Sequence, residues 1–140
     1  MTSETSKVLI KNGEIIKTLY DNFKAVNIPA VLEQMDPEMS WTEAEGYIYG
    51  GTYIGADAIL ENVFKKLATE WEGFMATPDK IVDGRDTVVA IGRYSGKYLK
   101  TGKTVDVPFA HVWTFNKGRI TSFVQHTDTL VVARQLGLIQ

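Results

Sequence analysis

Apolar residues in the first half of the chain recur with the period of an α-helix. Between residues 11 and 26 they occupy one helical face, with the i, i+3, i+4, i+7 spacing of Ile16, Leu19, Tyr20 and Phe23. Pro29 suits the first turn of a second, short helix, which we expect to end at Asp36-Pro37 because the residue before a proline avoids the helical region. A third helix is predicted over residues 56–69, where apolar residues recur four apart.

The pattern changes to the alternation of β-strands after Glu72. Four segments rich in β-branched and aromatic residues are separated by tight turns, at residues 74–83, 87–99, 104–115 and 119–127. We also expect residues 39–45 to be extended and residues 129–136 to form a last short helix. Helices followed by an antiparallel meander predict an α+β fold. The expected architecture is a conical barrel, in which a curved, mostly antiparallel sheet wraps around about three N-terminal helices and leaves a pocket.

Composition narrows the class of protein. A chain of 140 residues suggests one domain, residues 1–140, in which the polar residues 1–7 are expected to be flexible. The net charge of −2 provides no general field for nucleic acid or an anionic membrane, and the lack of cysteine excludes disulfides and thiolate chemistry. No apolar run approaches the roughly 18 to 20 residues that span a bilayer, and we see no signal-peptide pattern. We therefore expect a cytoplasmic protein with no nucleic-acid or membrane partner.

The strand over residues 104–115 carries the first candidate for chemistry, His111. Because strand residues alternate between faces, His111 shares a face with Phe109 and Trp113. An imidazole among aromatic rings could shuttle a proton or donate a hydrogen bond to a ligand. The alternative is a structural histidine that fills core volume.

The next strand carries Gln125 and His126, which must face opposite ways. We favour Gln125 as the inward residue because it shares its face with Phe123. A pair of His126 with Asp128 resembles part of an acid–base relay. The alternative, which we prefer, makes Asp128 the N-cap of the last helix and His126 a partly exposed sheet residue.

Two glutamates follow Trp41 on one face of the predicted strand over residues 39–45. If Trp41 points inward, Glu43 and Glu45 follow it, and desolvation would raise a carboxyl pKa into the range of a general base at neutral pH. The alternative is that both glutamates are solvated at the rim. Tyr49, in the glycine-rich segment 46–55, is expected to line the mouth of the same pocket. No histidine pair has the spacing usual for metal ligands, so we expect no metal.

Two segments of the sequence resemble a known family. The pattern W-x-E-A-E-G-x-x-Y-G-G-T-Y-x-G covers residues 41–55, and F-A-H-V-W-T covers residues 109–114. Both are similar to segments of the SnoaL-like branch of the nuclear transport factor 2-like superfamily, especially its ketosteroid isomerase-related proteins. The resemblance extends from about residue 8 to 136. It implies a conical α+β barrel with a deep apolar pocket that often forms a homodimer.

The resemblance implies acid–base chemistry on a small apolar carbonyl compound, without a cofactor, as in an isomerase, a cyclase or a dehydratase. Glu43 would abstract a proton next to the carbonyl, and His111 or Tyr20 would stabilise the enolate oxygen. The expected ligand contacts are Trp41, Tyr20, Tyr49, Trp113, Gln125 and Glu45. SnoaL-type cyclases have an acid–base aspartate where this chain has Gln125, and a glutamine exchanges no proton at neutral pH. The alternative function is a non-catalytic ligand-binding or dimerising domain.

Overall fold

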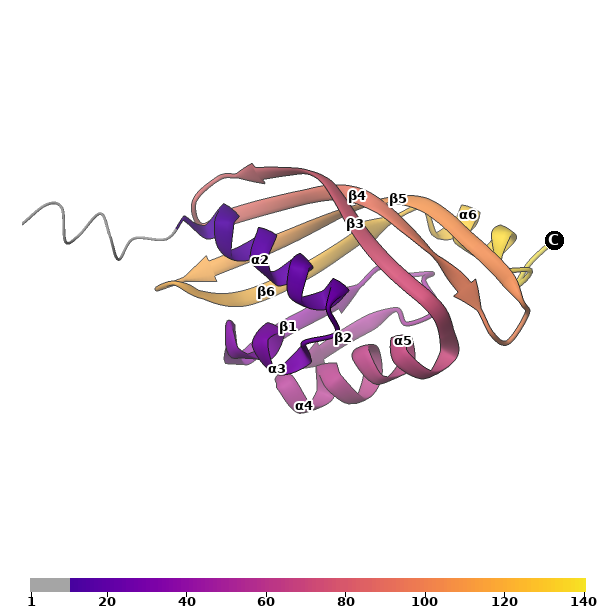
Figure 1. Ribbon diagram of the computed structural model, residues 1–140, viewed down its shortest axis with the longest axis horizontal. Helices are drawn as coiled ribbons and strands as arrows, with labels where there is room; N and C mark the ends of the chain where they lie inside the picture. The colour runs from indigo at the N-terminus through magenta and orange to yellow at the C-terminus, as the bar shows by residue number, and fades with distance from the viewer. Residues whose placement is uncertain (1–10) are drawn as a thin grey trace, which may run out of the picture.

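The fold is a six-stranded, mostly antiparallel sheet with helices packed against one side, as the computed structural model of residues 11–140 shows (Figure 1). The predicted flexibility of residues 1–7 concerns a segment outside the residues that the structure describes. In chain order the elements are α2 (Asn12–Lys24), α3 (Ile28–Glu33), β1 (Met35–Glu43), β2 (Gly51–Ile54), α4 (Ala56–Ile59), the π-helical turn η1 (Leu60–Phe64), α5 (Lys65–Glu70), β3 (Trp71–Asp83), β4 (Thr87–Tyr98), β5 (Lys103–Asn116), β6 (Arg119–Thr127) and α6 (Thr129–Gln135).

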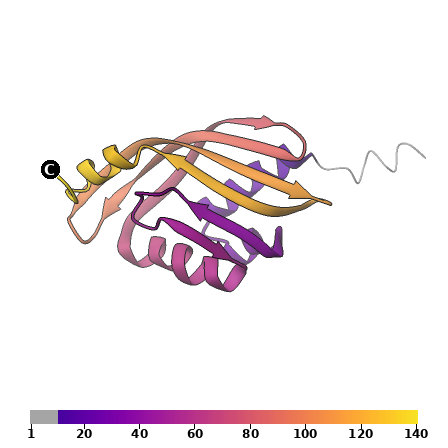
Figure 2. The same cartoon turned by 180° about the vertical axis from the view of Figure 1, so that it is seen from behind.

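The strand order is β2-β1-β6-β5-β4-β3. Strands β3 to β6 form the antiparallel meander that the alternation in the second half of the sequence predicts. Strand β1 then pairs in parallel with β6, with Trp41 opposite Phe123, and β2 closes the edge as a hairpin with β1. Seen from behind, strands β1, β6 and β5 lie in front of α2 (Figure 2). The α+β prediction is confirmed.

The first strand differs from its predicted bounds. It begins at Met35 and ends at Glu43, whereas the sequence predicts a strand over residues 39–45 and a second helix that continues to Asp36. Pro37 lies inside β1, where the register with β6 shifts between Met35 and Ser40. A proline is tolerated at such an irregularity because no ladder hydrogen bond is needed from its nitrogen. Strand β2, in the glycine-rich segment, was not predicted.

Gly92 determines how closely β3 crosses β4 above the helices. A Cβ atom at this position would lie 2.0 Å from the carbonyl oxygen of Thr77 and 2.8 Å from the ring of Phe109. The register between β3 and β4 also shifts next to this contact, between Pro78 and Lys80. Only a glycine permits this approach, which bends the sheet over the space occupied by the site.

Candidate functional site

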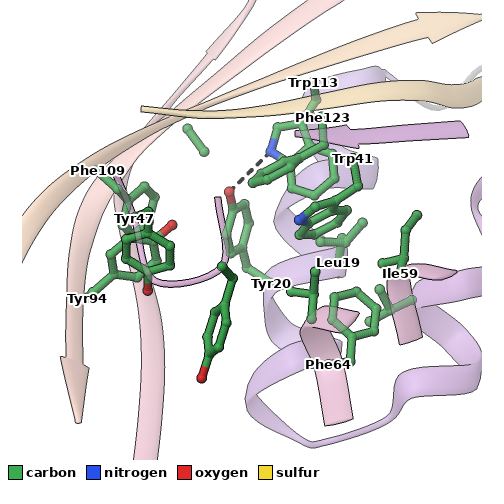
Figure 3. Close-up of a cluster of buried hydrophobic side chains, with 14 of the residues drawn as sticks. Leu19, Tyr20, Trp41, Tyr47, Ile59, Phe64, Tyr94, Phe109, Trp113 and Phe123 are labelled. Carbon is green, nitrogen blue, oxygen red and sulfur yellow. Dashed lines mark hydrogen bonds between the residues drawn. The ribbon is translucent and has the colours of Figure 1, made fainter. Parts of the chain in front are cut away.

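A cavity of about 400 Å³ lies between the curved sheet and the helices. Its wall is mostly aromatic and aliphatic, and the close-up shows several of these side chains converging from α2, β1, β4, β5 and β6 (Figure 3). Six of the eight site residues expected from the sequence are part of this wall: Tyr20, Trp41, Glu43, His111, Trp113 and Gln125.

Two cross-strand rows on the inner face of the sheet build the deep end of the cavity. In the first row His111 on β5 lies opposite Gln125 on β6 and Ala90 on β4. In the second row Trp113 lies opposite Phe123, which in turn lies opposite Trp41. The sheet therefore places a polar row directly beside an aromatic row, so a polar group on an apolar ligand would find partners at one end only.

His111 is held between two tyrosine hydroxyls. Its Nδ1 lies 2.5 Å from the hydroxyl of Tyr20, and its Nε2 lies 2.5 Å from the hydroxyl of Tyr94. The ring is 4% exposed and stacks on Phe109 at 4.0 Å between ring centroids. Burial lowers the pKa of His111 well below its usual value, and His126 lowers it further. The imidazole is therefore neutral at physiological pH.

Each tyrosine hydroxyl also accepts a hydrogen bond from a second group. The indole N–H of Trp113 donates to Tyr20 at 3.1 Å, drawn in Figure 3, and the amide of Gln125 donates to Tyr94 at 2.8 Å. A neutral imidazole has one N–H and one acceptor nitrogen. One tyrosine must therefore donate to His111, while the other accepts from it. The accepting tyrosine keeps its own O–H free for a ligand, whichever tautomer is present.

Gln125 is fixed at both ends of its amide. Its oxygen accepts from the backbone N–H of Ala44 at 3.0 Å, while its nitrogen donates to Tyr94. The Ala44 contact joins the end of β1 to β6. The inward orientation of Gln125, with an exposed His126 on the opposite face, agrees with the preference stated from the sequence.

Glu43 is the acidic group of the cavity. Its side chain is 5% exposed, and burial raises the pKa of its carboxyl from 4.5 to about 8. The indole N–H of Trp41 lowers the pKa of Glu43 and so opposes part of this shift. Within residues 11–140, however, no acceptor lies in hydrogen-bond geometry with this N–H. The negative form of Glu43 also raises the pKa of the phenols of Tyr47 and Tyr94, on which burial has the larger effect. At neutral pH the carboxyl is therefore mostly protonated and close to the tyrosines.

Trp41 presents a buried N–H without an acceptor among the described residues. Its ring is 5% exposed and packs at 3.9 Å between centroids on Phe123, so the indole is shielded from solvent. A buried donor without a partner costs free energy. Because Trp41 is part of the cavity wall, an acceptor atom of a ligand could satisfy this N–H.

Two of the expected ligand contacts lie elsewhere. Glu45 is exposed, because β1 ends at Glu43 and the chain then turns, with the N–H of Tyr47 bonded to the carbonyl of Ala44. Tyr49 is buried outside the cavity wall, where its hydroxyl donates to Glu70 at 2.6 Å and accepts from the indole of Trp71 at 2.9 Å. The strand end could not be located from the alternation alone.

The relay suggested for His126 is not formed, because Asp128 caps α6 by accepting from the N–H of Val131 at 3.0 Å. This is the alternative preferred from the sequence. The catalytic assignments of His111 and Glu43 stay predictions, since a position in the cavity wall does not test a role.

Tyr94 is the residue that sequence reasoning missed. It lies on the inner face of β4 with Val88, Ala90 and Gly92, so the same alternation that identified His111 could have found it. Its hydroxyl reaches His111 because the small residues Ala90 and Gly92 leave space between the two side chains.

The comparisons with known proteins agree with this fold. The sequence profile of the SnoaL-like domain family matches residues 16–123, so the chain belongs to that family. No curated protein matches the chain. Within residues 11–140 no helix is long and apolar enough to cross a membrane, and no group of three acidic or histidine side chains could hold a metal ion.

Several solved structures are similar along nearly the whole chain. An NTF2-like protein from Burkholderia thailandensis is 38% identical with a TM-score of 0.87, over 91% of this chain and 98% of that one. TerC, co-crystallised with polyporic acid, is 28% identical with a TM-score of 0.79, over 89% of this chain and 96% of that one. A putative SnoaL-like polyketide cyclase from Jannaschia is 22% identical with a TM-score of 0.74, over 91% of this chain and 92% of that one, and shares the fold.

Proposed function

We propose that this protein is an acid–base enzyme that moves a proton on a small, mostly apolar carbonyl compound. Glu43 transfers the proton, and the free hydroxyl of Tyr20 or Tyr94 donates to the carbonyl oxygen. The observation that carries this proposal is the Glu43 carboxyl, which is buried in the wall of an aromatic cavity and has its pKa raised to about 8. A carboxyl with a pKa near neutrality can both take and return a proton under physiological conditions.

The reaction begins with the ionised fraction of Glu43, about one tenth of the molecules at pH 7 for a pKa of about 8. The carboxylate takes a proton from the carbon next to the carbonyl. The electron pair of that C–H bond moves into the C–C–O unit and forms an enolate, whose oxygen accepts the free tyrosine O–H. In a carbonyl compound whose C=C bond is conjugated with this enolate, return of the same proton to the far carbon of that bond gives an isomer and restores the carboxylate. Atoms and charge balance without a cofactor.

His111 acts in this scheme by holding the tyrosines. Both of its ring nitrogens bond to tyrosine hydroxyls at 2.5 Å, so a ligand oxygen reaches a phenol more readily than the imidazole. The high pKa of both phenols, raised by burial, keeps them protonated and able to donate. The network fixes the hydroxyl positions before a substrate arrives, which is the arrangement that stabilises developing negative charge most effectively.

Support for a small organic ligand comes from the cavity and from TerC, the relative at 28% identity that was co-crystallised with polyporic acid. Trp41 adds a further donor without an acceptor in the cavity wall of the described chain. The alternative function is a binding domain without catalysis. Gln125 favours it, because this amide is fixed by Ala44 and Tyr94 and cannot serve as a second acid–base group.

A direct test of the proposal is hydrogen–deuterium exchange at the activated carbon of an apolar ketone. We suggest 2-tetralone as the probe, followed by proton NMR in deuterated buffer. The wild type should accelerate exchange over the protein-free rate, and Glu43→Gln should lose at least about 100-fold of that acceleration, as is usual for a lost general base. Glu38→Gln, an exposed glutamate on the same strand, is the matched control. Equal exchange by the wild type and Glu43→Gln would leave the binding alternative.

We also propose a homodimer that uses the outer face of the sheet. Val82 and Ile91 are 44% and 42% exposed there, next to Val89. Sedimentation velocity of the wild type and of Ile91→Lys tests this assignment. We expect the wild type to be a dimer and the lysine in Ile91→Lys to dissociate it. A monomeric wild type would exclude the proposed dimer.

A further inference from the structure

Val26 has a backbone conformation that is unfavourable for its side chain. Helix α2 ends in a Schellman motif, in which the N–H of Val26 bonds to the carbonyl of Phe23 at 3.0 Å and the N–H of Asn27 bonds to that of Asn22 at 2.8 Å. This motif puts Val26 in the left-handed region, with φ of 58°. The position is usually glycine, and a β-branched residue there is an outlier.

The side chain of Val26 is also exposed to solvent. At 73% it has the largest exposed fraction among the large apolar residues of the described chain. Within residues 11–140 the other residues outside glycine with positive φ are the polar turn residues Arg85 and Lys117. Valine at this position therefore carries two costs, backbone strain and apolar exposure. Such strain is typical of positions that serve a ligand.

The position of Val26 indicates what the ligand is. Val26 is part of the cavity wall, on the rim that also carries Lys24 and Ile28, and Phe74 and Met75 of β3 also border the cavity. Val26 and Lys24 are both exposed, so they mark the mouth, whereas Glu43 and the tyrosines are buried inside. Lys24 is the only lysine or arginine in the wall, and it makes no salt bridge within the described residues.

We propose that the mouth of the cavity recognises an amphipathic organic anion. The apolar body of the ligand extends out of the cavity onto Val26, and its acidic group pairs with the ammonium of Lys24. This inference rests on the proposed function, and it narrows the substrate class to apolar acids with a reactive carbonyl at the inner end. Glu43 does not oppose such an anion at neutral pH, because its raised pKa of about 8 keeps most of the carboxyl neutral.

Two fluorescent probes with the same aromatic skeleton separate the apolar part from the charge. 8-Anilino-1-naphthalenesulfonate is anionic, and N-phenyl-1-naphthylamine lacks the sulfonate. We expect the wild type to bind the anionic probe several-fold more tightly, and Lys24→Gln to remove this preference. Lys80→Gln changes an exposed lysine on β3 outside the cavity wall and should leave the preference intact.

Variants of Val26 test the apolar contact and the strain together. Val26→Gly should weaken both probes by about 3- to 10-fold through the lost apolar contact, yet raise the melting temperature by about 3 °C because glycine relieves the strain. Val26→Ala should weaken both probes similarly with a smaller gain in melting temperature, because alanine keeps part of the penalty at positive φ. The opposed changes in affinity and stability distinguish a ligand contact from a merely tolerated valine.

The possible failures point to different parts of the account. If the wild type binds neither probe, the apolar pocket of the proposed function is lost, and this inference with it. If the wild type binds both probes but Lys24→Gln and Val26→Gly bind them unchanged, this inference alone is overturned. Sedimentation velocity tests whether Val26 contacts a second copy of the chain instead of a ligand. Dissociation of a dimer by Val26→Gly, with probe affinity unchanged, would also overturn the inference.

Discussion

Replacing Glu43 by glutamine should change how the stability of the fold depends on pH. The two side chains have nearly the same shape, so the substitution removes the ionisable proton and leaves the packing of the cavity wall in place. Glu43 is 5% exposed, and burial raises the pKa of its carboxyl from 4.5 to about 8. The perturbation therefore isolates one titrating group whose folded and unfolded pKa values differ strongly.

The direction of the effect follows from proton linkage. Because the pKa of Glu43 is higher in the folded chain, the unfolded chain loses this proton first as pH rises. The contribution of the neutral carboxyl to stability is fully present below about pH 4.5 and is lost as pH rises to about 8. Each pKa unit corresponds to about 1.4 kcal/mol, so a shift of this size is worth roughly 5 kcal/mol. Water entering the open cavity reduces this value, and we expect a loss of about 2 to 5 kcal/mol.

Urea unfolding between pH 3.5 and 9 measures the effect. The free energy of unfolding of Glu43→Gln minus that of the wild type should be close to constant below pH 4.5 and should increase by a few kcal/mol toward pH 8. All other titrating groups are shared and largely cancel in this difference. Glu38→Gln, exposed on the same strand, should give a flat difference. A difference for Glu43→Gln that varies by less than about 0.5 kcal/mol between pH 5 and 9 would refute the buried neutral carboxyl.

Two further predictions concern the groups that support the site. His111→Ala should lower the free energy of unfolding in urea by about 3 kcal/mol, because it removes a buried ring and two hydrogen bonds to tyrosines. His111→Gln should recover part of this loss. A stability of His111→Ala equal to that of the wild type would contradict the hydrogen-bond network. Gly92→Ala should lower the free energy of unfolding by more than about 2 kcal/mol, because its Cβ would lie 2.0 Å from the carbonyl oxygen of Thr77. The control is Ser95→Ala, which changes an exposed residue on the same strand. Equal stability of the two variants would show that β3 can move aside.

The sequence predicts the parts of this fold that depend on periodicity. Alternation along β5 and β6 correctly turns His111 and Gln125 inward, and His126 outward, since one face of each strand is apolar. The predicted start of the first strand is wrong because Pro37 is typical of a helix end. In the structure Pro37 lies inside β1, beside a register shift that tolerates a proline. Periodicity also indicates the face of the sheet on which a side chain lies, but not the residues that it contacts. The contact of Tyr94 with His111 depends on the small residues of β4 and on strand register, which only the folded sheet reveals.

The rate of deuterium exchange into 2-tetralone as a function of pH tests the central claim most directly. The claim is that the ionised Glu43 carboxyl, with a pKa of about 8, is the proton-transferring group. After subtraction of the protein-free rate, the rate for the wild type should rise about tenfold per pH unit between pH 5 and 7 and level off above about pH 8. A wild-type rate that is independent of pH over this range, or one with a midpoint near 4.5, would contradict the claim.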